Sequence, residues 1–287
     1  MKAMSDGVSR SSGHVAELPR AQGRLRLTFA SRNGRTSISA LEQSGCLRAR
    51  LPRPERGAFA GAVMLNTAGG IASGDRLTTE VEWGAGARAT VSAAAAERAY
   101  RARIVDRPAR VETMLTVGEG ASAEWLPQEL ILFDGARLER SMQVSLAGDA
   151  TVLLVEALVF GRTARGEMIT SGSLHDAIEI RRDNVLVHAD RTRLEGDIAG
   201  LLARPAVADG GAAIALILWA GQAPEDARDR LRAALRHAAC GDAGVSLKDG
   251  LVLARLVARD GAVLRRLVVA ALGALRQDRP LPRVWLC

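Results

Sequence analysis

Residues 79–92 read TEVEWGAGARATVS: an alternating stretch, a glycine turn and a second β-like stretch. The same plan returns in residues 114–125 (MLTVGEGASAEW) and 142–155 (MQVSLAGDATVLLV), and in residues 177–191 with Asp183-Asn184 as the turn. These units lie about 28 to 34 residues apart, and one such unit cannot bury its own apolar face. The repeat predicts a mostly β fold of stacked strand-turn-strand units, as a β-sandwich or a β-solenoid-like stack; an ordinary antiparallel meander is the plainer alternative.

The flanking segments predict one hairpin and two helices. Leu25, Leu27 and Phe29 alternate with polar residues, which indicates a strand over residues 23–30, and the Asn33-Gly34 turn leads into a second strand over residues 35–41. In the C-terminal third, Pro224 starts one apolar-periodic helix that Gly241 ends. A second helix is expected over residues 262–276, with paired strands over residues 245–259 between the two.

Composition sets the broad class of the chain. Its 287 residues, 48% hydrophobic and 25% charged, are typical of a globular protein, and we expect a flexible leader over residues 1–22 and a single domain over 23–287. No apolar run reaches the roughly 18 residues of a membrane span, and residues 1–20 lack the apolar stretch of a secretory signal. We therefore expect a cytoplasmic protein without membrane contact. Cys46, Cys240 and Cys287 stand far apart and are expected to be reduced thiols.

The net charge of +7 raises the possibility of nucleic-acid binding. All but two of the 39 basic residues are arginine and they are scattered along the chain, while aromatic residues make up only 3%. A focused basic face and stacking platforms are therefore not indicated. A β-rich nucleic-acid-binding or carbohydrate-active protein stays an alternative, and an acidic partner surface is compatible with the charge.

Known catalytic and ligand-binding patterns are not recognisable in the sequence. The glycine-rich loop over residues 66–75 lacks both GxGxxG and GK[ST], and a strand is expected after it, which argues against a phosphate site. The four histidines show no zinc spacing, and no nucleophile elbow is present. We predict that the chain is not an enzyme, with no catalytic residues and no tightly bound cofactor.

Several carboxylates occupy unusual positions. Glu156 interrupts the apolar run VLLVEALVF, where a charge must be paired, protonated or turned toward water in a cavity. Asp190 raises the same question in residues 185–190. Pro127 marks an edge or bulge beside Glu129, a setting in which side chains are often re-aimed toward a functional site. Pairing with an arginine or simple solvation is the alternative for each of them.

Taken together, the motifs resemble the UreD (UreH) family of urease accessory proteins. The matching stretches run from about residue 23 to the C-terminus; they are LEQSGCLR (41–48), the Gly69-Gly70 to Gly74-Asp75 loop, Tyr100-Arg101, Glu124 to Glu129 with Phe133, Phe160-Gly161-Arg162 with Gly166-Glu167, and Pro282-Arg283-Val284-Trp285. The chain departs from many members at Asn66-Thr67-Ala68, where they have His-Pro-Pro before the glycine pair. It also departs at Glu97-Arg98-Ala99, where many have Ser or Thr followed by Lys before the Tyr-Arg pair.

The resemblance implies a scaffold for urease maturation. Such proteins form a complex with UreF and the GTPase UreG, bind the urease apoprotein, and help deliver nickel through an internal polar passage, while GTP is bound by the partner. On this basis Asp75, Glu156 and Asp190 are candidates for transient Ni²⁺ contact along the passage, with Glu97 and Glu129 as weaker candidates. Glu156→Ala or Asp75→Ala is expected to lower urease activation while the complex still assembles.

Overall fold

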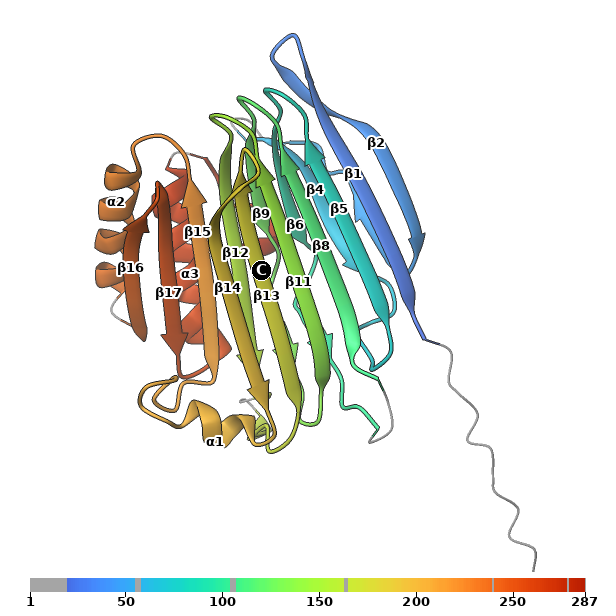
Figure 1. Ribbon diagram of the computed structural model, residues 1–287, viewed down its shortest axis with the longest axis vertical. Coiled ribbons are helices and arrows are strands. Elements are labelled where there is room, and N and C mark those ends of the chain that lie inside the picture. The colour runs from blue at the N-terminus through green and yellow to red at the C-terminus, as the bar shows by residue number, and fades with distance from the viewer. Residues whose placement is uncertain are drawn as a thin grey trace, which may run out of the picture.

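The structure is a computed structural model that describes residues 20–54, 58–103, 107–162, 165–238, 240–277 and 279–286. Most of the leader expected over residues 1–22 lies outside this range, as does Cys287, and the first strand begins at Gln22. Two β-sheets lie one behind the other, and helices flank the rear sheet (Figure 1). The prediction of a mostly β fold with two helices in the C-terminal third is confirmed.

The two sheets are named here by their place in Figure 1. The front sheet has the strand order β14-β13-β11-β8-β5-β1-β2. Its strands are β1 (Gln22–Arg32), β2 (Arg35–Gly45), β5 (Arg76–Trp83), β8 (Ala109–Val117), β11 (Arg137–Leu146), β13 (Ser173–Arg182) and β14 (Val185–Glu195). The back sheet has the order β16-β17-β15-β12-β9-β6-β4-β3, and the short strands β7 and β10 join it through β12. Its strands are β3 (Leu47–Arg50), β4 (Ala60–Asn66), β6 (Arg88–Ala93), β7 (Glu97–Ala99), β9 (Ser122–Leu126), β10 (Leu130–Leu132), β12 (Thr151–Phe160), β15 (Ala213–Ala220), β16 (Asp242–Lys248) and β17 (Leu251–Ala258).

The three glycine-turn units of the sequence are arches between the two sheets. β5 leads into β6, β8 into β9 and β11 into β12, so each turn carries the chain from the front sheet to the back sheet. Equivalent strands pair in parallel, with Val81 opposite Leu115 and Leu115 opposite Val144. Gly86 and Gly120 hold φ values of 65° and 66° in these turns, a left-handed backbone that costs other residues about 1–2 kcal/mol. The sandwich and the solenoid are thus one structure, because solenoid-like coils form the middle of a two-sheet sandwich.

The fourth unit is a hairpin and not an arch. β13 and β14 pair antiparallel inside the front sheet, and the turn residues Asp183 and Asn184 have φ values of 49° and 66°. The predicted hairpin of β1 and β2 is closed in the same way by Asn33 and Gly34, with φ values of 52° and 73°. Two consecutive left-handed residues match the twist of adjacent antiparallel strands, so this turn returns the chain to the same sheet.

Helices cover the outer side of the back sheet at its C-terminal end. α2 (Pro224–Ala238) and α3 (Gly261–Arg276) lie where the sequence predicts them, with the predicted strand pair β16 and β17 between them. α3 contacts β15 and β17 and buries Leu264, Leu267 and Leu272 in a second apolar core, separate from the core between the sheets. Each such leucine stabilises the fold by about 1.5–3 kcal/mol. Among the described residues, no helix combines the length and apolarity needed to cross a bilayer.

One helix is not predicted by the sequence. α1 (Ile198–Leu202) has five residues, too few for a helical period to be visible. It begins at Asp197, whose carboxylate accepts a hydrogen bond from the Gly200 N–H at 2.9 Å. Tertiary packing of Ile198 and Leu202, both buried, stabilises this single turn.

Candidate functional site

Two cavities between the sheets share part of their lining. The central cavity has a volume of about 320 Å³ and the edge cavity a volume of about 180 Å³. Glu156, Asp176 and Ile178 line both of them, so these residues stand where the cavities meet. Glu97 of β7 also lines the central cavity, and Asp190 of β14 lines the edge cavity. Polar groups thus occur along an interior that is otherwise filled by apolar side chains.

Arg140 binds both carboxylates at the meeting point of the cavities. Its Nη1 lies 2.9 Å from Oε2 of Glu156, and its Nη2 and Nε lie 2.5 and 3.2 Å from the two oxygens of Asp176. Trp125 adds a hydrogen bond from Nε1 to Oε1 of Glu156 at 3.1 Å. We call Arg140, Glu156 and Asp176 the junction. It joins the sheets, because Arg140 and Asp176 are paired residues of β11 and β13 in the front sheet and Glu156 is on β12 in the back sheet.

Burial governs the ionisation of the junction. Desolvation raises the pKa of Glu156, and the nearby charge of Asp176 adds to this effect, while Arg140 and the Trp125 N–H oppose it. Desolvation lowers the pKa of Arg140, but the two carboxylates outweigh it and leave that pKa above its usual value. A guanidinium does not lose its proton in proteins, so Arg140 stays a fixed positive charge between the two acids.

Glu97 lines the central cavity but not the edge cavity. Asn66 donates from Nδ2 to its Oε2 at 3.0 Å, and the backbone N–H of Arg98 donates to Oε1 at 3.0 Å. Burial raises the pKa of Glu97, while these two hydrogen bonds and the charge of Arg98 act in the opposite direction. Part of the side chain stays exposed, so this carboxylate meets both solvent and the cavity.

Asp190 occupies the edge cavity as half of a second cross-sheet pair. Its Oδ2 lies 2.6 Å from Nη2 of Arg255, which comes from β17 in the back sheet. His188, two residues earlier on β14, has a buried Nε2 with no hydrogen-bond partner among the described residues. Desolvation lowers the pKa of His188, and Arg255 and Lys248 reinforce this effect against Asp190, so the ring is neutral near pH 7.

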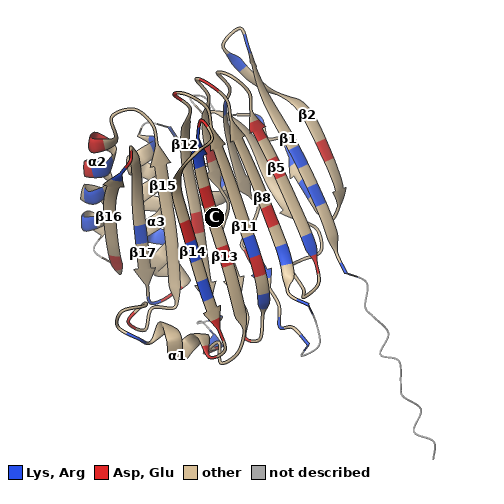
Figure 2. Cartoon of the chain, in the orientation of Figure 1, with Lys and Arg blue, Asp and Glu red and all other residues tan. Residues whose placement is uncertain are grey.

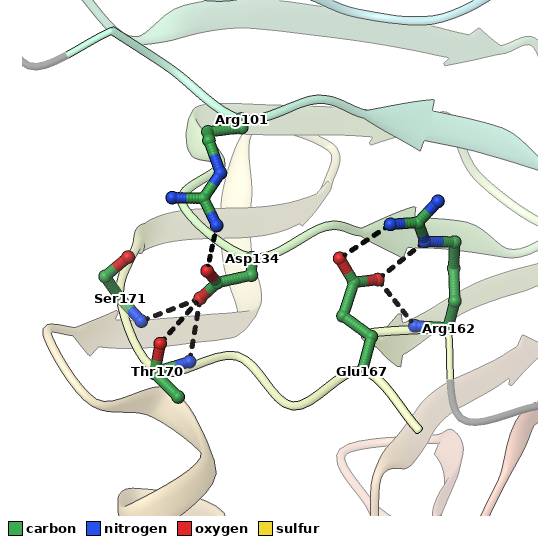
Figure 3. Close-up of polar contacts among 6 residues, drawn as sticks. All are labelled: Arg101, Asp134, Arg162, Glu167, Thr170 and Ser171. Carbon is green, nitrogen blue, oxygen red and sulfur yellow. Dashed lines mark hydrogen bonds and ion pairs between the residues drawn. The ribbon is translucent and has the colours of Figure 1, made fainter. Parts of the chain in front are cut away.

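A second group of polar contacts includes Arg101, Arg162 and Glu167, which belong to the motifs that resemble the UreD family (Figure 3). Asp134 accepts hydrogen bonds from the backbone N–H groups of Thr170 and Ser171 at 2.8 and 2.9 Å and pairs with Arg101. Desolvation opposes these bonds, but together with the charge of Arg101 they keep the pKa of Asp134 low. The group therefore fastens the loop before β13 to the loop after β10.

Figure 3 also shows an ion pair between Arg162 and Glu167, two residues that follow β12. Both Glu167 oxygens are bound by Arg162, with its Nε 2.8 Å from Oε2 and its Nη2 3.0 Å from Oε1. The Arg162 guanidinium also lies 4.4 Å from the centroid of the Phe133 ring. Phe133 in turn packs edge-on against Tyr100, whose hydroxyl donates to the Gly69 carbonyl at 2.7 Å. Motifs that are far apart in the sequence are therefore one connected surface in the structure.

Sequence comparison with known proteins shows the family of the chain. The profile of a family described as UreD urease accessory protein matches residues 21–286. The chain belongs to the UreD family. Urease accessory protein UreD 3 of Bradyrhizobium sp. strain BTAi1 is 45% identical over 278 residues, covering 96% of this chain and 97% of that protein. Urease accessory protein UreD of Azorhizobium caulinodans strain ORS 571 is 44% identical over 266 residues, with 93% and 96% covered.

The UreD-like loop over residues 69–75 places Asp75 in a supporting position. Its two oxygens accept hydrogen bonds from the backbone N–H groups of Ala21 and Ala72, each at 2.8 Å, and its side chain is buried. Asp75 does not line the central or the edge cavity. It holds the loop against the start of β1. Gly70 is needed in this loop because a Cβ there would lie 2.3 Å from the Tyr100 ring.

Glu129 and its UreD-like neighbours bind the C-terminal segment. Arg265 of α3 lies 3.2 Å from Oε1 of Glu129, donates to Gln128 at 2.6 Å, and lies over the Trp285 ring at 5.2 Å from its centroid. Trp285 donates from Nε1 to the Leu126 carbonyl at 3.1 Å. Of the five candidate carboxylates, Glu97, Glu156 and Asp190 therefore line the two cavities, while Asp75 and Glu129 lie outside them.

The other two residues of the junction were not predicted from the sequence. Arg140 and Asp176 occupy inward positions of strands, in line with Leu138 and Met142 or with Leu174 and Ile178. A charged residue at an inward position of an alternating strand is the signal that could have found them. Among the described residues, no three His, Cys, Asp or Glu side chains converge closely enough to hold a metal ion.

Proposed function

We propose that this protein is a urease maturation factor that helps deliver nickel to the urease apoprotein, and that the ion moves through the two cavities between the sheets. The observation that carries the proposal is that Glu97 and Glu156 line the central cavity, that Glu156 and Asp190 line the edge cavity, and that the two cavities share Glu156 and Asp176. Family membership supports the link to urease, since the relatives are named urease accessory proteins.

The chemistry of the lining suits an ion in transit. Spaced carboxylates offer oxygen ligands one at a time, and Ni²⁺ bound by few oxygens and by water is released readily, whereas several imidazole or thiolate ligands would hold it. Glu97 and Asp190 line different cavities, and among the described residues no group of three or more His, Cys, Asp or Glu side chains could hold the ion. In this proposal the chain is a chaperone and scaffold and not a catalyst.

We further propose that the chain acts in a complex with UreF and UreG. Nucleotide hydrolysis is assigned to UreG, because residues 66–75 lack the phosphate-binding pattern and form a loop held by Asp75 in front of β5. The connected motif surface around Phe133 and Arg162 offers a preformed, firmly held face for protein contact.

The proposal is tested by affinity purification of the tagged full-length chain together with UreF, UreG and urease apoprotein, with and without GTP. The recovered urease is then supplied with limiting Ni²⁺, and its nickel content and activity are measured. We expect all three partners to co-purify and nickel to enter urease only in the presence of this chain. Failure to retain any of the three would contradict the proposal.

A further inference from the structure

The junction contains two carboxylates that would attract a cation and an arginine that already binds both of them. It contains two buried carboxylates, with side chains 9% and 10% exposed for Glu156 and Asp176, and these are the groups that a divalent cation would seek. Both are already bound by Arg140, whose side chain is only 13% exposed. The place that a metal ion would take between the two acids is therefore filled by a guanidinium.

The positive charge of Arg140 cannot be removed by a change of pH. A lysine or histidine could lose its proton and free the two acids, but Arg140 remains charged at every pH at which the protein is folded. While both acids are ionised, only another cation can take its place. Two acids and one guanidinium leave the junction with an excess of one negative charge when all are ionised, so an approaching cation is still attracted.

We infer that Arg140 is a built-in cation that competes with nickel in the passage. Arg140 dissociates from Glu156 and Asp176 when Ni²⁺ binds them and pairs with them again when the ion leaves, so that the passage conducts nickel without retaining it. This inference rests on the proposed function and names the residue that sets how long the ion stays. The exchange makes and breaks only ion pairs, and the metal leaves as the divalent ion that entered.

Geometry favours exchange over a purely static clamp. Arg140 reaches both acids from one side chain, with separate nitrogens for each, so it can release Glu156 and Asp176 one after the other. The sheets stay joined during such a movement, because Asp190 and Arg255 form another cross-sheet pair at the edge cavity. Glu156 lines the central cavity from the back sheet, where the Trp125 N–H holds its carboxylate.

The test compares Arg140→Gln, Arg140→Lys and the double variant Arg140→Gln/Glu156→Gln in the full-length protein bound to its partners. Equilibrium dialysis against Ni²⁺ measures retained nickel. We expect the Arg140→Gln complex to retain one nickel ion more than the complex with the natural chain. Its affinity for this ion should be at least about tenfold higher than that of the natural junction, which is equivalent to about 1.4 kcal/mol. The double variant is expected to lose this gain. Arg110→Gln, which removes an exposed ion pair between Arg110 on β8 and Glu139 on β11, is the control and should not change nickel retention.

Arg140→Lys keeps the inference testable if Arg140→Gln does not fold. A lysine has one nitrogen and cannot bind both acids in the forked manner of arginine, so nickel affinity should lie between those of the natural chain and Arg140→Gln. If neither variant retains more nickel than the natural chain, the inference is wrong. If Arg140 is only structural, its replacement will lower the stability of the protein without increasing the amount of retained nickel.

Nickel transfer to urease separates this inference from the proposed function. If Glu156→Gln slows transfer while Arg140→Gln neither slows it nor retains nickel, the passage stands and the role of Arg140 fails. If Glu156→Gln and Glu97→Gln both transfer nickel at the natural rate, the proposed passage itself fails, whatever nickel the Arg140 variants retain.

Discussion

Glu124 illustrates how buried carboxylates are held in place in this fold. Its oxygens accept hydrogen bonds from Nε of Arg276 at 3.0 Å, from Nη2 of Arg279 at 2.9 Å and from the Thr90 hydroxyl at 2.5 Å. Glu124 and Arg276 are each only 2% exposed. The network fastens the end of α3 to β9, and it lies on the outer side of the back sheet, away from the cavities. Its role is structural.

Replacing Glu124 should therefore reduce stability strongly. Glu124→Gln leaves Arg276 charged, buried and without its carboxylate, which typically costs about 3–5 kcal/mol. Urea denaturation followed by circular dichroism measures the loss. Glu112→Gln is the matched control, because Glu112 is exposed on the front sheet and its replacement should change the free energy of unfolding by less than about 0.5 kcal/mol. Equal effects of the two substitutions would contradict this account.

Glu167 should show the opposite pH dependence from Glu97. The hydrogen bond from Arg162 lowers the pKa of Glu167 below its ordinary value of 4.5, so the stability it contributes is present above pH 4.5 and is lost as the pH falls through the lowered pKa. Thermal unfolding of Glu167→Gln should show destabilisation at pH 7 that disappears in acid.

The pKa of Glu97 is raised by burial, so its contribution is present below pH 4.5 and is lost as the pH rises through the raised pKa. Glu97→Gln should therefore be neutral or slightly stabilising at pH 7. A destabilisation by Glu97→Gln that grows between pH 5 and pH 8 would be inconsistent with this assignment.

At the level of single residues, the sequence indicated which carboxylates occupy unusual positions, but it did not indicate which side chains bind them. Glu156 was recognisable because it interrupts an apolar run, but its partner Arg140 lies on another strand in the opposite sheet. Asp75 ends a glycine-rich loop, and nothing in that local pattern distinguishes an acid that lines a cavity from one that accepts two backbone hydrogen bonds. Partnership depends on long-range register, which a local pattern does not contain.

At the level of elements, the hairpin of β1 and β2 shows where a glycine is indispensable. Gly34 and Gly45 both have left-handed backbone, with φ values of 73° and 60°. A Cβ at Gly34 would meet no atom within 4 Å, whereas a Cβ at Gly45 would lie 1.6 Å from the Gln22 carbonyl oxygen. Gly45 thus allows the end of β2 to pass directly beside the start of β1.

This contrast gives a prediction for two alanine substitutions. Gly34→Ala should cost about 1–2 kcal/mol, the penalty of left-handed backbone alone. Gly45→Ala should cost several times more or prevent folding, because backbone must move to make room. Chemical denaturation and the yield of folded protein measure both. A loss of stability for Gly45→Ala no larger than that for Gly34→Ala would overturn the assignment.

Periodicity predicted the strands and the two long helices, but not how the turns join them. The arch turns at Gly86 and Gly120 and the hairpin turn at Asp183-Asn184 all follow an alternating stretch. Whether the next strand stays in the sheet or crosses to the other is set by the local backbone and by the neighbouring coils that receive it. The direction of each turn was therefore only visible in the structure.

At the level of the whole molecule, the two sheets present different outer faces. Basic and acidic residues are interspersed along the strands of the front sheet (Figure 2), with surface pairs such as Arg24 and Glu80 at 2.8 Å. The back sheet instead carries α3 and the C-terminal segment over its outer side. This layer packs on the face of the back sheet that is turned away from the core between the sheets, so we expect it to act on the stability of the fold.

Trp285 should stabilise this outer layer. It is 2% exposed and packs in the second core, so Trp285→Ala should cost about 3–5 kcal/mol through the cavity it leaves. Leu286→Ala is the control, because Leu286 is 70% exposed and should be almost neutral. Calorimetric unfolding compares the two. A small effect of Trp285→Ala would mean that the C-terminal segment contributes little to the fold.

The central claim is that nickel reaches urease through the interior of this protein. The most direct measurement is the rate of Ni²⁺ incorporation into urease apoprotein by the purified complex at limiting nickel, for Glu97→Gln, Glu156→Gln and the exposed control Glu112→Gln. Assembly of each complex is checked by co-purification. We predict that both interior variants assemble but load nickel several-fold more slowly, while the control is unchanged. Loading at the natural rate by both interior variants would contradict the account.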